Sequence, residues 1–206
     1  MKRLFLASVA ANTLDLIIPL LPDSPSKLKL AFVPTASNIY KNREWVDIDR
    51  NKLIDMGFSV KDVDIEGKSE SVLREELSGI DVLFVSGGNT FYLLEKARES
   101  GFDKLAKEFI DAGKVYIGSS AGSVFVCSTI EFVSGMDDPK VAPNLKSYEG
   151  LNEVDFLLMP HQGDDEYKEL YDKVLTKWRG LGYEVKTLTN NEALIVKGDK
   201  SEIVRT

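Results

Sequence analysis

The chain is poor in several features that mark whole classes of protein. Cys127 is its only cysteine, so an intrachain disulfide and a cysteine-based zinc site are both excluded. Lys and Arg together number 26 against 33 Asp and Glu, and no dense basic run occurs, which disfavours nucleic acid as a partner. No apolar stretch is long enough to cross a bilayer, so no membrane partner is expected. These absences favour a protein of the reducing cytoplasm.

No Pro-, Gly- or Ser-rich linker divides the 206 residues, so we predict a single domain over residues 1–206. With 43% apolar and 29% charged residues, the composition is that of a globular protein. The start, from Lys2 to Ala11, imitates the charged and apolar parts of a signal peptide. Polar residues interrupt it at Asn12 and Thr13, so we interpret it as the first strand of a cytoplasmic protein.

Short apolar runs alternate with helical patterns, which is typical of a mostly parallel sheet covered by helices on both faces. This predicts a three-layer α/β fold. Two helices have clear apolar stripes, one from Phe102 to Ile110 and one from Tyr167 to Trp178. The predicted strands are Leu4 to Ser8, Leu28 to Pro34, Ser59 to Ile65, Val82 to Ser86, Val115 to Ser119, Phe156 to Met159, Tyr183 to Thr187 and Ala193 to Lys197.

A pentapeptide at the end of one predicted strand carries the strongest chemical signal. Gly118-Ser119-Ser120-Ala121-Gly122 follows an apolar run and leads into an apolar segment, so it predicts a strand, a sharp turn and a helix. This is the setting of a nucleophile elbow, in which the central residue points out of a strained turn. Ser120 is therefore the candidate nucleophile, while Cys127 is interpreted as a buried small hydrophobe.

A serine hydroxyl needs a base, and His161 is the only histidine. It follows a predicted strand and should lie at the same edge of the sheet as Ser120. A carboxylate is expected to orient it, for which Glu192 is the first choice because it stands where a polar turn enters a strand, and Asp137 is the reserve. Oxyanion donors are expected from the amides of Ala121 and Gly88. The Gly87-Gly88 turn alone does not distinguish an oxyanion donor from a phosphate cradle.

Three segments together resemble peptidase family S51, which includes the α-aspartyl dipeptidases called peptidase E and the cyanophycinases. They are Val85-Ser86-Gly87-Gly88-Asn89-Thr90-Phe91-Tyr92-Leu93-Leu94, Ile117-Gly118-Ser119-Ser120-Ala121-Gly122-Ser123 and Met159-Pro160-His161. The resemblance spans essentially the whole chain and implies a flavodoxin-like fold related to class I glutamine amidotransferases. It also implies a serine peptidase that hydrolyses small peptides, dipeptidase-like, through an acyl-enzyme.

By this resemblance Ser120 attacks the scissile carbonyl, His161 shuttles the proton and Glu192 orients His161. Gly88 and Ala121 form the oxyanion hole, and no metal or organic cofactor is implied. Substrate contacts are expected from Asn89, Asp137 and Gln162, and the protein is expected to be a monomer or a homodimer.

Aspartyl dipeptidases of the family carry arginines downstream of the histidine. Here that segment holds the acids Asp164, Asp165 and Glu166, and the first arginine after His161 is Arg179. We therefore expect weak cleavage after aspartate and a preference for neutral or basic residues.

Two other functions fit the same residues. One is a serine hydrolase acting on a non-peptide amide or ester, because an elbow fixes the reaction type better than the substrate. The other is a catalytically inactive flavodoxin-like binding module, in which Gly87-Gly88 holds a phosphate.

Overall fold

The computed structural model describes residues 1–206, and a seven-stranded sheet forms its centre. The strand order is β3-β2-β4-β5-β1-β8-β9, with β1 to β5 mutually parallel and the last two antiparallel. The segment that imitates a signal peptide is thus a central strand, paired with β5 and β8. The strands are β1 (Arg3–Ala7), β2 (Lys29–Val33), β3 (Ser59–Asp62), β4 (Val82–Val85), β5 (Val115–Ser119), β8 (Glu192–Lys197) and β9 (Lys200–Arg205).

Side chains of the central strands alternate between two separate hydrophobic cores. In β1, Leu4 and Leu6 pack into one core while Phe5 and Ala7 pack into the other, as the two-residue period of a strand requires. All four side chains are fully buried. A strand that is apolar on both faces must be covered on both, which explains the near-continuous apolar runs in the sequence.

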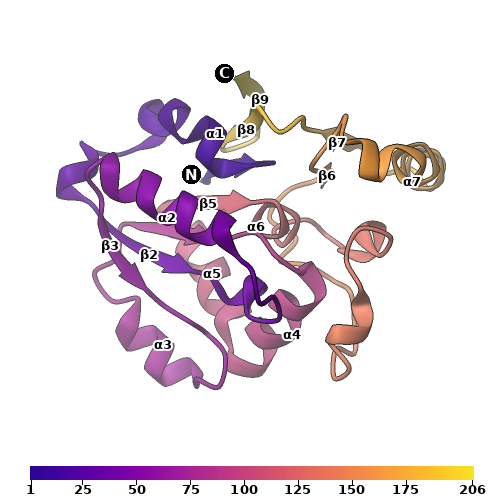
Figure 1. Ribbon diagram of the computed structural model, residues 1–206. Coiled ribbons are helices and arrows are strands. Elements are labelled where there is room, and N and C mark those ends of the chain that lie inside the picture. Colours follow the sequence, from indigo (N-terminus) through magenta and orange to yellow (C-terminus); the bar gives the residue numbers. More distant parts are fainter.

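Helices cover the two faces of the sheet, and Figure 1 shows α1 and α2 on one side with α3, α4 and α5 on the other. The predicted three-layer, mostly parallel α/β fold is therefore confirmed. The α-helices are α1 (Ala10–Thr13), α2 (Glu44–Asp55), α3 (Glu70–Glu76), α4 (Thr90–Ser100), α5 (Phe102–Asp111), α6 (Ala121–Val124) and α7 (Lys168–Gly180). Short 3₁₀ helices are η1 (Leu14–Leu20), η2 (Pro25–Lys27), η3 (Thr35–Ser37), η4 (Glu131–Val133), η5 (Pro139–Val141) and η6 (Asp165–Tyr167).

The sheet differs from the sequence prediction in two places. The predicted strands near 156–159 and 183–187 exist as β6 (Leu157–Met159) and β7 (Val185–Thr187), but they pair with each other in a separate two-stranded sheet beside α7. Strand β9 was not predicted. It lies at the sheet edge and is mostly exposed, so it lacks the apolar run by which the other strands were recognised.

The parallel strands bring their carboxyl ends to one edge of the molecule. Ser8 follows β1, Gly87 follows β4 and Ser120 follows β5, so segments far apart in the chain meet there. His161 follows β6 and approaches the same edge from the smaller sheet. In open α/β sheets this edge is where ligands bind.

Candidate active site

Ser120 sits on a sharp turn between β5 and α6. Its backbone has φ 47° and ψ −107°, a conformation that non-glycine residues rarely adopt. The turn needs its glycines, because a Cβ at Gly122 would lie 2.1 Å from the carbonyl oxygen of Val85. A Cβ on Gly118 would lie 2.6 Å from the carbonyl carbon of Gly122. The pentapeptide therefore adopts the predicted elbow for steric reasons.

Hydrogen bonds lock this turn to the neighbouring strand. The Ser120 amide donates to the carbonyl of Ala7 at 3.0 Å. The Ser123 hydroxyl lies 2.8 Å from the carbonyl oxygens of both Ala7 and Gly118. These contacts hold the strained residue in place and leave its side chain to point into the cavity above the sheet.

The structure brings Ser120 and His161 together. Ser120 Oγ lies 2.8 Å from His161 Nε2, the contact that a nucleophile and its general base require. His161 also has a positive φ of 65°, and its amide donates to Ser8 Oγ at 2.8 Å. Ser8, from the end of β1, is thus part of the site although no sequence motif pointed to it.

The other ring nitrogen of His161 contacts Asn190 and not Glu192. His161 Nδ1 lies 2.8 Å from Asn190 Oδ1. The Glu192 carboxylate instead accepts a hydrogen bond from the Thr189 amide at 2.9 Å, so it closes the turn that enters β8. The expected contact between Glu192 and His161 is therefore absent, and Asn190 occupies that place instead.

The sequence does not single out Asn190, because the group expected beside a catalytic histidine is a carboxylate. An amide oxygen can accept the same hydrogen bond from an imidazole N–H, although it carries no net charge. The polar turn before the strand at 193–197 does indicate the right segment, since it contains both Asn190 and Glu192. Choosing between the two requires the direction of each side chain in that turn, which residue spacing does not give.

Gly88 lines the same cavity as Ser120, and Ala121 follows the serine in the chain, so the two oxyanion-hole amides remain predictions. Gly88 lines the cavity with Gly87, and its φ of 140° suits glycine. A Cβ there would lie 2.3 Å from the carbonyl oxygen of Ala36. Ala121 is the first residue of α6, where a backbone N–H has no partner within the helix.

Ser120 and His161 line a cavity of about 470 Å³. Aromatic and apolar side chains form much of its wall, among them Tyr40, Trp45 and Tyr167. Its charged lining residues, apart from the histidine, are Asp49 and Asp137, and none is Lys or Arg. Two carboxyl groups without a fixed cation disfavour an acidic ligand.

Of the three predicted substrate contacts, only Asp137 lines the cavity. Its Oδ2 accepts hydrogen bonds from the amide and the hydroxyl of Thr90, at 2.8 and 2.6 Å. Burial raises the pKa of Asp137, against the opposing effects of Thr90 and of nearby His161. The Asn89 side chain instead accepts from the Tyr92 amide at the start of α4, and exposed Gln162 lies outside the cavity lining.

The acidic segment after the histidine does not line the cavity either. Asp165 and Glu166 are exposed, while the Asp164 carboxylate accepts a hydrogen bond from Asn190 Nδ2. The expectation that these acids face the substrate is therefore corrected. The carboxyl groups that do line the cavity are those of Asp49 and Asp137.

Asp49, on α2, is one of the two carboxyl groups that line the cavity and is only 3% exposed. Burial raises its pKa to about 7, while hydrogen bonds from the Ala11 amide and with the Ser119 side chain oppose the rise. The Ala11 contact measures 2.9 Å and caps the start of α1. No sequence pattern singled out Asp49, because a lone carboxylate on an amphipathic helix normally lies on its solvated face.

The remaining candidate groups have no catalytic geometry. Cys127 is fully buried and burial raises its pKa to about 12, as expected for a packing residue. No cluster of three His, Cys, Asp or Glu side chains has the arrangement to hold a metal ion. No helix combines the length and apolarity needed to cross a bilayer.

Comparison with known proteins places this chain in a family. The model of "Peptidase family S51" matches residues 4–204. The uncharacterized peptidase Lmo0363 of Listeria monocytogenes is 36% identical over 201 residues, which cover 96% of each chain. A peptidase E of Shewanella denitrificans is 30% identical over 140 residues, covering 68% of this chain and 56% of that protein. The crystal structure of a candidate peptidase E protein from Listeria monocytogenes EGD-e has a TM-score of 0.92 and 34% identity, covering 100% of this chain and 99% of that one. The chain therefore belongs to peptidase family S51 and is a serine-type peptidase.

Proposed function

We propose that this peptidase hydrolyses dipeptides and other small peptides whose first residue is neutral or basic, through an acyl-enzyme on Ser120. The observation that carries the proposal is the 2.8 Å contact between Ser120 Oγ and His161 Nε2 at the floor of the cavity. The relatives named peptidase E support peptide as the substrate class.

In the proposed reaction Ser120 Oγ bonds to the scissile carbonyl carbon while its proton passes to His161 Nε2. The amides of Gly88 and Ala121 donate to the oxygen that becomes negative. His161 then gives the proton to the leaving amine as the C–N bond breaks. Water, deprotonated by the same histidine, then attacks the ester carbonyl carbon, and His161 returns that proton to Ser120 Oγ as the bond to the acid breaks. Asn190 orients His161 in this scheme.

Small peptides fit the dimensions of the site. A cavity of about 470 Å³ lies in the range of small-molecule pockets, of the order of 300–1,000 Å³, which suits a small peptide better than a long extended one. Asp137 would take the substrate's terminal ammonium in this proposal, because its hydrogen bonds from Thr90 use Oδ2 and leave Oδ1 available. Asn89 supports this role indirectly, since its side chain donates to the carbonyl of neighbouring Asp138 at 3.1 Å.

The charge of the cavity supports the preference for neutral or basic residues. A substrate carboxylate about 4 Å from one of the pocket acids would meet a repulsion of roughly 4 kcal/mol at an effective dielectric near 20. That corresponds to a loss of roughly three powers of ten in kcat/KM.

The test is a set of matched dipeptides, Asp-Leu, Asn-Leu, Ala-Leu and Lys-Leu, assayed with the wild type and with Ser120→Ala. We expect Ala-Leu and Lys-Leu to be cleaved well, Asp-Leu least, and none by the variant. A clear preference for Asp-Leu would refute the charge argument. Failure of all four substrates, with turnover of simple esters or amides, would replace the peptide substrate by a non-peptide one.

A further inference from the structure

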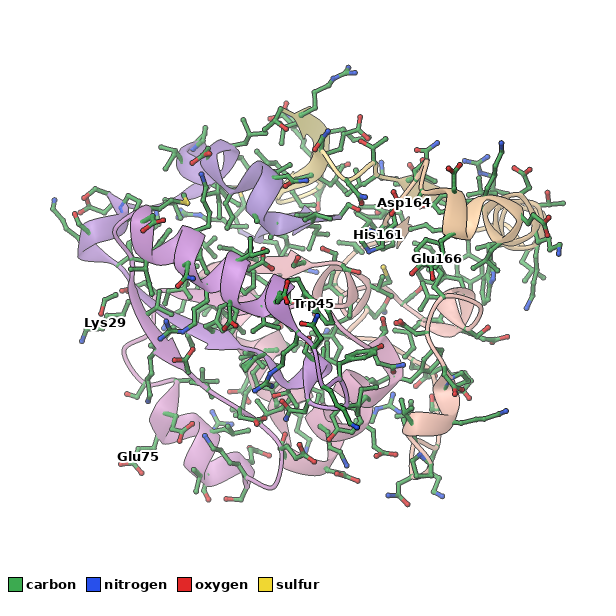
Figure 2. All side chains as sticks on the ribbon, viewed as in Figure 1. Lys29, Trp45, Glu75, His161, Asp164 and Glu166 are labelled. Atoms are coloured by element: carbon green, nitrogen blue, oxygen red, sulfur yellow. The ribbon has the colours of Figure 1, made fainter.

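Asn190 lies between the catalytic histidine and a carboxylate. Its Oδ1 faces His161 Nδ1 at 2.8 Å, and its Nδ2 donates to both carboxylate oxygens of Asp164, at 2.9 and 3.1 Å. Asp164 Oδ2 is 3.8 Å from His161 Nδ1. Figure 2 shows Asp164 beside His161, where the chain leads into α7. In a Ser-His-Asp triad the carboxylate contacts the histidine directly. Here the Asn190 amide contacts the histidine, and the Asp164 carboxylate contacts the amide.

The direction of each hydrogen bond follows from what Asp164 can do. An ionised carboxylate only accepts, so the Asn190 group facing it must be the NH₂ and the group facing His161 must be the oxygen. An oxygen opposite Nδ1 requires Nδ1 to carry the proton. His161 Nε2 then presents its lone pair to Ser120 Oγ, as a general base must.

Ser8 reinforces the same orientation. Its Oγ accepts from the His161 amide at 2.8 Å, so its own proton is free to be donated to Asn190 Oδ1 at 3.0 Å. The amide oxygen of Asn190 is then held by one donor from Ser8 and one from the imidazole, and the amide nitrogen by Asp164. Only this orientation of the Asn190 amide gives hydrogen-bond partners to both its oxygen and its nitrogen.

We propose that Asp164 is a positioning residue of the catalytic pair, whose carboxylate fixes the amide of Asn190 and, through it, the tautomer of His161. This inference rests on the proposed Ser120 and His161 chemistry. Asp164 also places a negative charge near the imidazolium that forms as Ser120 is deprotonated. The arrangement replaces a direct carboxylate by a carboxylate acting through an amide.

The test exchanges the carboxylate of Asp164 and the amide of Asn190. Asp164→Asn should lower kcat for Ala-Leu roughly 10- to 100-fold with little change in KM, less than the roughly 10⁴-fold loss known when a directly contacting aspartate becomes asparagine. Asn190→Asp should also be impaired, because two carboxylates would face each other at about the present 3 Å spacing. The double variant Asp164→Asn/Asn190→Asp should recover activity to within a few-fold of wild type, since carboxylate and amide have exchanged places.

Asp165→Asn is the matched control, because it removes the same charge from an exposed neighbour and should leave kcat unchanged. The rate at which a serine-directed phosphonylating probe labels Ser120 gives a second readout that needs no peptide substrate. It should fall in Asp164→Asn and recover in the double variant, even if the peptide assignment is wrong. Asp164→Asn behaving like Asp165→Asn, or a double variant no better than the single ones in both readouts, would overturn the proposal.

Discussion

The two sides of the catalytic pair are built in different ways. On the serine side, five consecutive residues form the elbow, and close backbone contacts at Gly118 and Gly122 enforce its shape. On the histidine side, Ser8, His161, Asp164 and Asn190 come from three distant segments and are joined by side-chain hydrogen bonds. Steric enforcement is local and tolerates almost no substitution. A hydrogen-bonded network can exchange partners, provided that donors and acceptors still match.

The largest effect is expected at the tip of the elbow. Ser120→Ala should lower kcat/KM for Ala-Leu by at least about a thousandfold, because the nucleophile is lost while little packing changes. Thermal melting should show an intact fold. Ser119→Ala is the control on the same turn. It should keep most activity and lose about 1 kcal/mol of stability, because the Ser119 hydroxyl accepts a hydrogen bond from the Ala10 amide at the start of α1.

The next effect tests the steric claim for the serine side. Gly122→Ala should reduce the free energy of unfolding by about 3 kcal/mol or more, because the new Cβ would lie 2.1 Å from the carbonyl oxygen of Val85. Urea unfolding measures it. Gly180→Ala, at the end of α7 with nothing within 4 Å of its Cβ position, should be neutral or stabilising. Equal effects for the two substitutions would show that the elbow is not sterically enforced.

The histidine side is tested by comparing Asn190 with Glu192. Asn190→Ala should lower kcat roughly 100-fold, because His161 Nδ1 loses its partner and the ring its orientation. Glu192→Gln should stay near wild type, since an amide oxygen can still accept from the Thr189 amide. If Glu192→Gln were inactive and Asn190→Ala active, Glu192 would regain the role first predicted for it.

The last effect concerns the pH dependence of folding stability and comes from Asp49. Its pKa is raised in the folded protein from 3.8 to about 7, so the folded state binds the proton more tightly than the unfolded state. The contribution of Asp49 to folding stability therefore falls as pH rises between about 4 and 7, by up to about 4 kcal/mol. Asp49→Asn removes this titration and can still accept from the Ala11 amide. The variant should exceed the wild type in Tm by clearly more at pH 8 than at pH 5; a gain that does not depend on pH would contradict the assignment.

The difference between the two sides also explains what the sequence could predict. The elbow, the strand that carries it and the single histidine are visible as local patterns, and the predicted contact between Ser120 and His161 is present. Asn190 and Ser8 are ordinary polar residues in the sequence, and only their meeting in space gives them a role. The burial of Asp49 could not be predicted for the same reason, because it depends on how α2 packs against α1.

Covalent labelling tests the central claim most directly. The wild type would be treated with a serine-directed phosphonylating probe, and the site of attachment read by intact mass and peptide mapping. The account predicts one adduct per chain, on Ser120, formed slowly in His161→Ala and absent in Ser120→Ala. A wild type that takes up no label, or a Ser120→Ala variant labelled as fully as the wild type, would contradict it.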